Sequence, residues 1–231
     1  MATAAQSRRL PSGAHGLPRE VVVRSQRERL LEAMVRVAAD KRYEATTVAD
    51  IIAAAGVSRT TFYELFADKE DCFLAAYDAV VDVLVHAVAS AYGSHDGDWP
   101  GRVHAGIAAL ADVLAEESAI ARLAMVEVTT AGPAARQRYR EALARFTPFL
   151  DEGRGHSEAS RQVPATTSLL AIGGVAALIF DEIRAGRGAE LRRLTPELAF
   201  AVLMPFIGPA PAAREMRRRV VAPPRKHAGS Q

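Results

Sequence analysis

A six-residue segment near the start of the chain concentrates side chains that can hydrogen-bond to base edges or phosphates. Its polar and basic members are Ser58, Arg59, Thr60, Thr61 and Tyr63. The guanidinium of Arg59 can donate two hydrogen bonds to O6 and N7 of guanine, and Thr60 or Thr61 can contact a thymine methyl group, a base edge or a phosphate. These residue types are suited to reading the major groove of DNA.

The flanking residues predict two short helices and a tight turn that would position these side chains. Thr47 and Asp50 have the spacing of a capping box that opens the first of the two helices. Gly56 can end it in a left-handed conformation, and Ser58 can cap the next helix, which runs through Phe66. An apolar seam at helical spacing joins the two helices, formed by Val48, Ile51, Ala55, Val57, Phe62 and Phe66. The pattern is that of a helix-turn-helix whose second helix faces the major groove.

Two further helices flank this pair: one completes the expected DNA-binding domain, and the other leads into the second domain. Apolar residues recur at three- and four-residue spacings from Arg24 to about Lys41, which predicts the first helix of the chain. Asp68 can cap a long fourth helix that carries the apolar residues Phe73, Tyr77, Val80, Val81, Leu84, Val85 and Val88. We expect a three-helix domain over residues 24–70 and a second helical domain over 71–208.

The motif resembles the DNA-binding signature of the TetR family of bacterial transcriptional regulators. The resemblance covers about residues 25–80 closely and is carried by Thr47, Gly56-Val57-Ser58, Thr61-Phe62-Tyr63, Phe66 and Asp68-Lys69-Glu70. It implies that Tyr63 and Lys69 contact phosphates, that the helix from Ser58 enters the major groove, and that the last two long helices pair in a homodimer. The expected DNA-binding residues are Thr47, Ser58, Arg59, Thr60, Thr61, Tyr63 and Lys69.

The chain departs from the family pattern at three positions. Leu65 stands where the family often has histidine, which removes one phosphate contact, and Ile52 stands where it usually has alanine between the two helices. Arg42 stands where glycine commonly ends the first helix. A left-handed conformation there costs a non-glycine residue roughly 1 kcal/mol.

Composition is that of a globular helical protein. Of 231 residues, 49% are hydrophobic, 24% charged and only 6% aromatic, and alanine is abundant, so we expect an all-α fold. The single Cys72 cannot form an intrachain disulfide, and its place on the apolar face of the fourth helix predicts a buried thiol. The residues after Met1 do not resemble a signal peptide, which makes a cytoplasmic location the default.

The second domain is expected to bind a ligand and to dimerise. Helices are expected at about 100–116, 118–130, 133–152, 164–185 and 195–207. The apolar run from Leu169 to Phe180, at twelve residues, is shorter than the roughly 18 that span a bilayer, so it predicts a buried helix and no membrane partner. The residues expected to bind ligand are Leu110, Leu114, Met125, Glu127, Tyr139, Leu143 and Phe146. Those expected at the dimer interface are Ala171, Gly173, Gly174, Ala177, Val202 and Phe206.

Both ends of the chain are basic, over residues 1–23 and over the proline-rich stretch 209–231. They are either solvated, disordered tails or weak binders of an anionic partner such as DNA phosphates. Their charge therefore does not by itself assign a function.

Other function classes find less support. Known catalytic motifs are missing, and no cofactor is expected. The spacing of His86, His95 and His104 defines no metal-ligand set, so no metal site is expected either. The predicted function is a homodimeric repressor that binds a palindromic operator in double-stranded DNA and is released by a small apolar ligand. The alternative is a helical adaptor that binds proteins and leaves DNA alone, which a gel shift with competitor DNA would distinguish.

Overall fold

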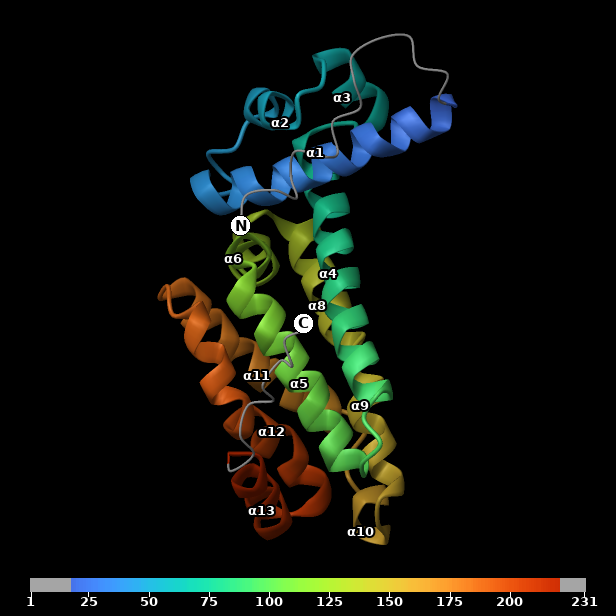
Figure 1. Ribbon diagram of the computed structural model, residues 1–231, viewed down its shortest axis with the longest axis vertical. Coiled ribbons are helices and arrows are strands. Elements are labelled where there is room, and N and C mark those ends of the chain that lie inside the picture. Colours follow the sequence, from blue (N-terminus) through green and yellow to red (C-terminus); the bar gives the residue numbers. More distant parts are fainter. Residues whose placement is uncertain (1–17, 221–231) are drawn as a thin grey trace, which may run out of the picture.

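The structure, a computed structural model, describes residues 18–220, and over this range all regular secondary structure is helical. A small three-helix bundle sits at one end of an elongated molecule, and longer helices form the rest (Figure 1). The N-terminal bundle and the helix that leads away from it are α1 (Arg19–Lys41), α2 (Val48–Ala55), α3 (Arg59–Leu65) and α4 (Lys69–Gly93). The all-α prediction is confirmed.

The second domain is built from α4 and the elements that follow it. Its middle part consists of α5 (Trp99–Glu116), α6 (Ser118–Arg122), the π-helix η1 (Leu123–Glu127), α7 (Val128–Thr130), α8 (Pro133–Ala144), α9 (Thr147–Asp151), the 3-10 turn η2 (Glu152–Gly155) and α10 (Glu158–Arg161). Its last part consists of α11 (Thr167–Arg184), the 3-10 turn η3 (Gly188–Glu190), α12 (Leu191–Ile207) and α13 (Pro209–Val220). The α6 helix and η1 lie directly against α1, while α13 lies at the opposite end of the molecule (Figure 1).

The local signals around the helix-turn-helix are confirmed. The Thr47 side chain accepts from the amide of Asp50 while the Asp50 carboxylate accepts from the amide of Thr47, which completes a capping box. Gly56 ends α2 with φ 64° and ψ 41°, a left-handed conformation that glycine adopts without steric cost. Ser58 caps α3 and Asp68 caps α4, each through its side-chain oxygen. Short-range sequence chemistry therefore fixes the four helix boundaries around α3, namely both ends of α2 and the starts of α3 and α4.

One hydrophobic core runs from the bundle into the second domain along α4. Leu30 and Met34 of α1, Ile51 of α2 and Phe62 of α3 are fully buried and join Phe73 of α4 in the same cluster. Cys72 is also fully buried, as predicted, and burial raises the pKa of its thiol to about 12. Among the described helices α4 alone has the length and apolar composition to cross a membrane, but its apolar face packs in this core.

Several helix boundaries differ from the expectations. The first helix begins at Arg19 rather than Arg24, directly after Pro18, and its added first turn carries Val21 and Val23 exposed rather than on a buried face. The segment expected as one helix over 133–152 breaks after Ala144. Residues 209–220 form α13, whereas the sequence predicted a proline-rich tail. Most of the basic N-terminal arm (1–17) and the end of the tail (221–231) lie outside the described residues.

The α11 helix is buried on one side only, which corrects the prediction of a buried helix. Ala176, Ile179 and Ile183 face the core. Leu170 is 72% exposed, and Leu169 and Leu178 are also exposed. An apolar run shows that a helix avoids water on several sides, but it does not distinguish the protein's own core from a surface that another molecule covers.

Candidate nucleic-acid interface and effector cavity

The α3 helix presents an exposed face at the end of the molecule (Figure 1). Phe62 is fully buried and holds the helix against α1 and α2, while Arg59, Thr60 and Tyr63 are exposed. The Arg59 guanidinium lies 5.6 Å from the centre of the Tyr63 ring, which restricts the orientation of the arginine before any partner binds. This face therefore groups the hydrogen-bond donors of Arg59, Thr60 and Tyr63 on one short helix.

Three other predicted DNA-binding residues already have structural partners. The Ser58 hydroxyl oxygen accepts from the amide of Thr61 at 3.0 Å and lies 2.9 Å from the hydroxyl oxygen of Thr61. The Thr47 hydroxyl donates to Asp50 at 2.8 Å. A contact from these hydroxyls to DNA would therefore share an oxygen or break a cap. Arg59, Thr60 and Tyr63 are better placed to meet a groove.

Lys69 is held by backbone carbonyl groups. Its Nζ atom donates to the carbonyl oxygens of Tyr43 at 3.0 Å and Thr46 at 2.9 Å, and it lies 4.3 Å from the centre of the Tyr43 ring. An ammonium group has three N–H bonds, so these two acceptors leave one for a phosphate. The structure thus gives Lys69 a role in fixing the loop before α2, a role that the sequence did not indicate.

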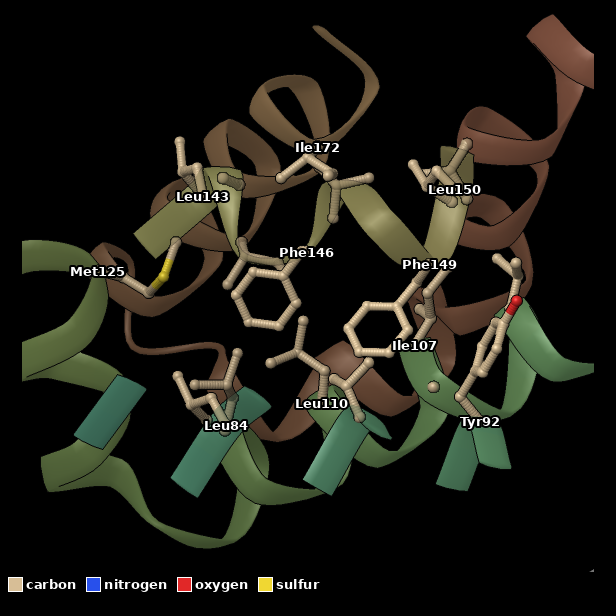
Figure 2. A pocket seen from close by; sticks show the side chains of 18 residues that line it. Leu84, Tyr92, Ile107, Leu110, Met125, Leu143, Phe146, Phe149, Leu150 and Ile172 are labelled. Atoms are coloured by element: carbon tan, nitrogen blue, oxygen red, sulfur yellow. The ribbon is translucent and has the colours of Figure 1, made fainter. Parts of the chain in front are cut away.

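The second domain contains an apolar cavity of about 110 Å³ between α4, α5, η1, α8, α9, α11 and α12. Eighteen residues line it, and Tyr92 is the only one of them with a polar side chain. Met125 and Tyr92 mark opposite ends, with Phe146 and Phe149 between them (Figure 2). Such a cavity can take hydrocarbon but offers almost nothing to hydrogen-bond a polar ligand.

Five of the seven residues expected to bind ligand line this cavity: Leu110, Leu114, Met125, Leu143 and Phe146. Glu127 and Tyr139 do not. Tyr139 packs against the core on its outer side, and burial raises the pKa of its hydroxyl. Glu127 is 2% exposed, and its carboxylate accepts from the amide of Tyr43 and pairs with Arg122. Both residues make structural contacts in the second domain and lie outside the cavity lining.

The remaining lining residues were not among those expected to bind ligand, and most of them come from α4, α11 and α12. They include Leu84, Val88 and Tyr92 of α4, Phe149 and Leu150 of α9, Ile172, Val175, Ala176 and Ile179 of α11, and Val202 of α12. A sequence signal existed in α4, which has more apolar positions than one packing face requires. For α11 and α12 the same surplus had been assigned entirely to dimerisation.

The expected dimer interface divides into outward and inward residues. Gly174 and Ala177 are exposed, and Ala171 and Gly173 are partly exposed. A Cβ atom added at Gly173 or Gly174 would meet no atom within 4 Å. Val202 and Phe206 are each 3% exposed, which corrects their assignment to the interface. Val202 lines the cavity, and the Phe206 ring packs on Trp99 at 5.5 Å.

Comparison with known proteins identifies the bundle. Residues 30–76 match the family model described as bacterial regulatory proteins, tetR family. The chain carries a TetR-family DNA-binding domain. The match spans α2, α3, the start of α4 and most of α1, so it includes the exposed face of α3. The family model therefore assigns DNA binding, the activity of TetR-type transcription regulators, to this bundle.

Solved TetR-type structures extend the likeness to the second domain. The fatty acid degradation regulator FadR from Bacillus halodurans has a TM-score of 0.68 at 18% identity, over 77% of this chain and 94% of that one. FadR from Bacillus subtilis, in complex with stearoyl-CoA, has a TM-score of 0.67 at 19% identity, over 78% and 98%. A TetR family regulator from Marinobacter aquaeolei VT8 has 0.62 at 22%, over 79% and 97%. No protein of curated function matches the chain. At these identities the likeness establishes the fold of the second domain.

No site for a metal ion is formed among residues 18–220. Within this range, no three His, Cys, Asp or Glu side chains come together in a group that could hold one.

Proposed function

We propose that this TetR-type regulator is a dimeric cytoplasmic repressor that leaves a palindromic operator when a long-chain acyl ligand fills its cavity. It acts by binding and has no catalytic role. The observation that carries the ligand class is the lining of the cavity, in which seventeen of eighteen residues have apolar side chains or none. Transfer of hydrocarbon from water into such surroundings is favourable at about 25 cal/mol per Å² of apolar surface.

The comparison with FadR supports an acyl chain. The Bacillus subtilis protein was solved with stearoyl-CoA, and its second domain shares the fold of this one. An unbranched chain suits a cavity that extends from Met125 at one end to Tyr92 at the other (Figure 2). A ligand with many polar groups would lose hydration there without gaining hydrogen bonds.

The size of the cavity implies that binding changes the protein. A cavity of about 110 Å³ is smaller than the roughly 150 Å³ apolar cavity that admits benzene, so an acyl chain must displace lining side chains. Phe146 and Phe149 are only partly buried and border the cavity between its ends. A ligand that needs an expanded cavity favours the expanded conformation, which is the requirement for a regulatory effect.

The polar end of the ligand fits best beside Tyr92. Its hydroxyl donates to Glu152 at 2.5 Å, and Arg102 pairs with the same carboxylate and lies over the Tyr92 ring. Burial raises the pKa of Tyr92, and the hydrogen bond to Glu152 adds to the effect, so this hydroxyl stays protonated and able to donate. Arg102 and Glu152 are exposed enough to exchange partners with an acidic head group.

A dimer through α11 and α12 accounts for the exposed apolar surface. Leu169, Leu170 and Leu178 of α11 and Met204 of α12 are between 40% and 72% exposed. Gly173 and Gly174 in the same region let a second helix approach closely. Two copies would present two α3 helices, and a symmetric pair of helices requires two equivalent half-sites in the DNA.

The experiment has two stages. Operator sequences are first selected from random DNA by the purified protein, and a pseudo-palindrome among the recovered fragments is expected. Stearoyl-CoA is then titrated against the free protein and against the operator complex. A typical coupling of 1–3 kcal/mol would lower operator affinity about 5- to 150-fold, and the operator must weaken stearoyl-CoA binding by the same factor.

A cavity-blocking variant is the matched control. Leu110→Trp fills the cavity and should abolish release by stearoyl-CoA, while Tyr139→Phe, outside the cavity, should leave release unchanged. Recovery of no DNA would favour the adaptor alternative. Equal stearoyl-CoA affinity with and without operator would show that this ligand is not the effector.

A further inference from the structure

The loop between α1 and α2, residues 42–46, contains a strained backbone. Arg42 has φ 70° and ψ 148°, and it is the only non-glycine residue with a positive φ among residues 18–220. This region of backbone conformation is populated almost entirely by glycine. A side-chain-bearing residue remains there only when surrounding interactions hold it, and such residues concentrate at switch regions.

The DNA-binding domain holds the loop from one side. The Thr46 amide and hydroxyl both donate to the carbonyl oxygen of Arg42, at 3.1 and 2.9 Å. Lys69 donates to the carbonyl oxygens of Tyr43 and Thr46. Thr46 is 2% exposed and precedes the Thr47 cap, so the conformation of this loop sets where α2 begins.

The effector domain holds the loop from the other side. The Glu127 carboxylate accepts from the Tyr43 amide at 2.9 Å and from Arg122 at 3.1 Å. Arg122 also donates to the carbonyl oxygen of Ala39, in the last turn of α1, at 3.0 Å. Because Glu127 is almost fully buried, losing one of these partners would leave a buried charge incompletely satisfied.

Glu127 is joined to the cavity by a single π-helical turn. The turn η1 runs from Leu123 to Glu127, and Met125 in its middle lines the cavity. A π-turn contains one more residue than an α-turn and is a common local adjustment point at functional sites. Met125 therefore lies two residues from the carboxylate that accepts the hydrogen bond from the Tyr43 amide.

We propose that Glu127 is a positioning residue that reports occupancy of the cavity to the DNA-binding domain through the strained Arg42–Thr46 loop. A ligand that fills the Met125 end rearranges η1 and withdraws the Glu127 carboxylate from the Tyr43 amide. Arg42 then relaxes, the carbonyl groups that hold Lys69 move, and α2 and α3 lose the orientation that fits the groove. The inference rests on the proposed function, whose regulatory step it assigns to named residues.

The first test needs neither a ligand nor DNA. Leu143→Trp fills the Met125 side of the cavity and Leu150→Trp fills the Tyr92 side (Figure 2). Hydrogen exchange of the Tyr43 amide is measured in both, with circular dichroism to confirm that each is folded. Exchange about tenfold faster or more in Leu143→Trp, with little change in Leu150→Trp, is expected. If Leu143→Trp does not fold, Leu143→Phe replaces it. Equal exchange rates in folded variants would overturn the inference.

The second test separates transmission from stability. Glu127→Gln keeps the shape of the side chain but removes its charge. Its operator complex should be weaker than that of the wild type. The ratio of its operator affinities without and with stearoyl-CoA should fall towards one. Asp112→Asn, a similar change in an exposed pair with Arg192, should keep the wild-type response. A Glu127→Gln protein with the full response would contradict the proposal.

Relief of the strain provides a rescue. Adding Arg42→Gly to Glu127→Gln should restore operator affinity, because glycine adopts the loop conformation without the contact between the Glu127 carboxylate and the Tyr43 amide. No rescue would count against the proposal. If stearoyl-CoA did not release the wild-type protein, the proposed ligand would be wrong, while the exchange experiment would still decide the role of Glu127.

Discussion

Lys69 at the start of α4 donates a 2.9 Å hydrogen bond to the carbonyl oxygen of Thr46, the residue just before the cap of α2. The bond joins the helix that enters the effector domain to the loop that begins the helix-turn-helix. The TetR resemblance assigns this lysine to a phosphate, but in the protein it also holds the loop before α2 in place.

Lys69→Ala should weaken operator binding without the electrostatic signature of a lost phosphate contact. A lysine bound to a phosphate contributes about one unit to the slope of log affinity against log salt. Because two N–H groups of Lys69 are taken by carbonyl oxygens, we expect the slope to change by well under one unit. Fluorescence anisotropy at several salt concentrations measures this. A full unit of change would show that Lys69 reaches the backbone of DNA.

Arg59→Ala should relax base preference and cost about 1–3 kcal/mol of specific binding. Its guanidinium stands on the exposed face of α3, oriented by Tyr63. Competition between the operator and random DNA measures the loss of preference. Arg140→Ala, an exposed arginine of α8, is the control and should bind like the wild type. Unchanged specificity in Arg59→Ala would contradict the assignment of α3 to the major groove.

Gly174→Leu should produce folded monomers. In the single chain an added Cβ meets no atom within 4 Å, so only a partner could clash with the new side chain. Overpacking of an interface typically costs about 1–3 kcal/mol, and operator affinity should fall with the dimer. Sedimentation and circular dichroism measure the two properties. Gly93→Leu, where a Cβ also meets open space, is the control, and a dimer of normal strength in Gly174→Leu would exclude this face of α11.

Asp50 should remain ionised to unusually low pH. Hydrogen bonds from Lys41 and Thr47 lower its pKa from 3.8 to about 2. Since the folded-state pKa is depressed, the capping box contributes its full stability above about pH 4 and loses it as the pH falls towards 2. NMR titration of the Asp50 carboxyl group measures the midpoint. Lys41→Met should raise that midpoint, and an unchanged value would show that the ion pair does not form in solution.

The helix-turn-helix was predictable because its signals are local. Thr47, Gly56, Ser58 and Asp68 act within four residues of their own position, so sequence spacing determines the geometry that they impose. Only part of the cavity lining was predictable from the sequence. Ile172 and Val202 line the cavity but come from helices far along the chain. The apolar face of a helix does not by itself show whether it packs against the core, a ligand or a second copy of the protein.

The role of Glu127 was not predictable, although the residue itself was noticed. A buried glutamate in an apolar stretch indicates that polar partners exist, but beside Arg122 the partner is the Tyr43 backbone amide, 84 residues away. Backbone amides carry no sequence signature. Arg42 gave a better clue, since it stands where the TetR family commonly has glycine, and its φ is positive in the structure.

The burial of Cys72 has a practical use. The chain has one cysteine, which is fully enclosed and whose thiol pKa is about 12, so thiol-directed spin labels and fluorophores will leave it unmodified at neutral pH. A cysteine introduced at Thr60 on α3 would then be the sole labelled position in each copy. The distance between two such labels across the dimer would follow the spacing of the recognition helices directly, in solution and at any ligand concentration.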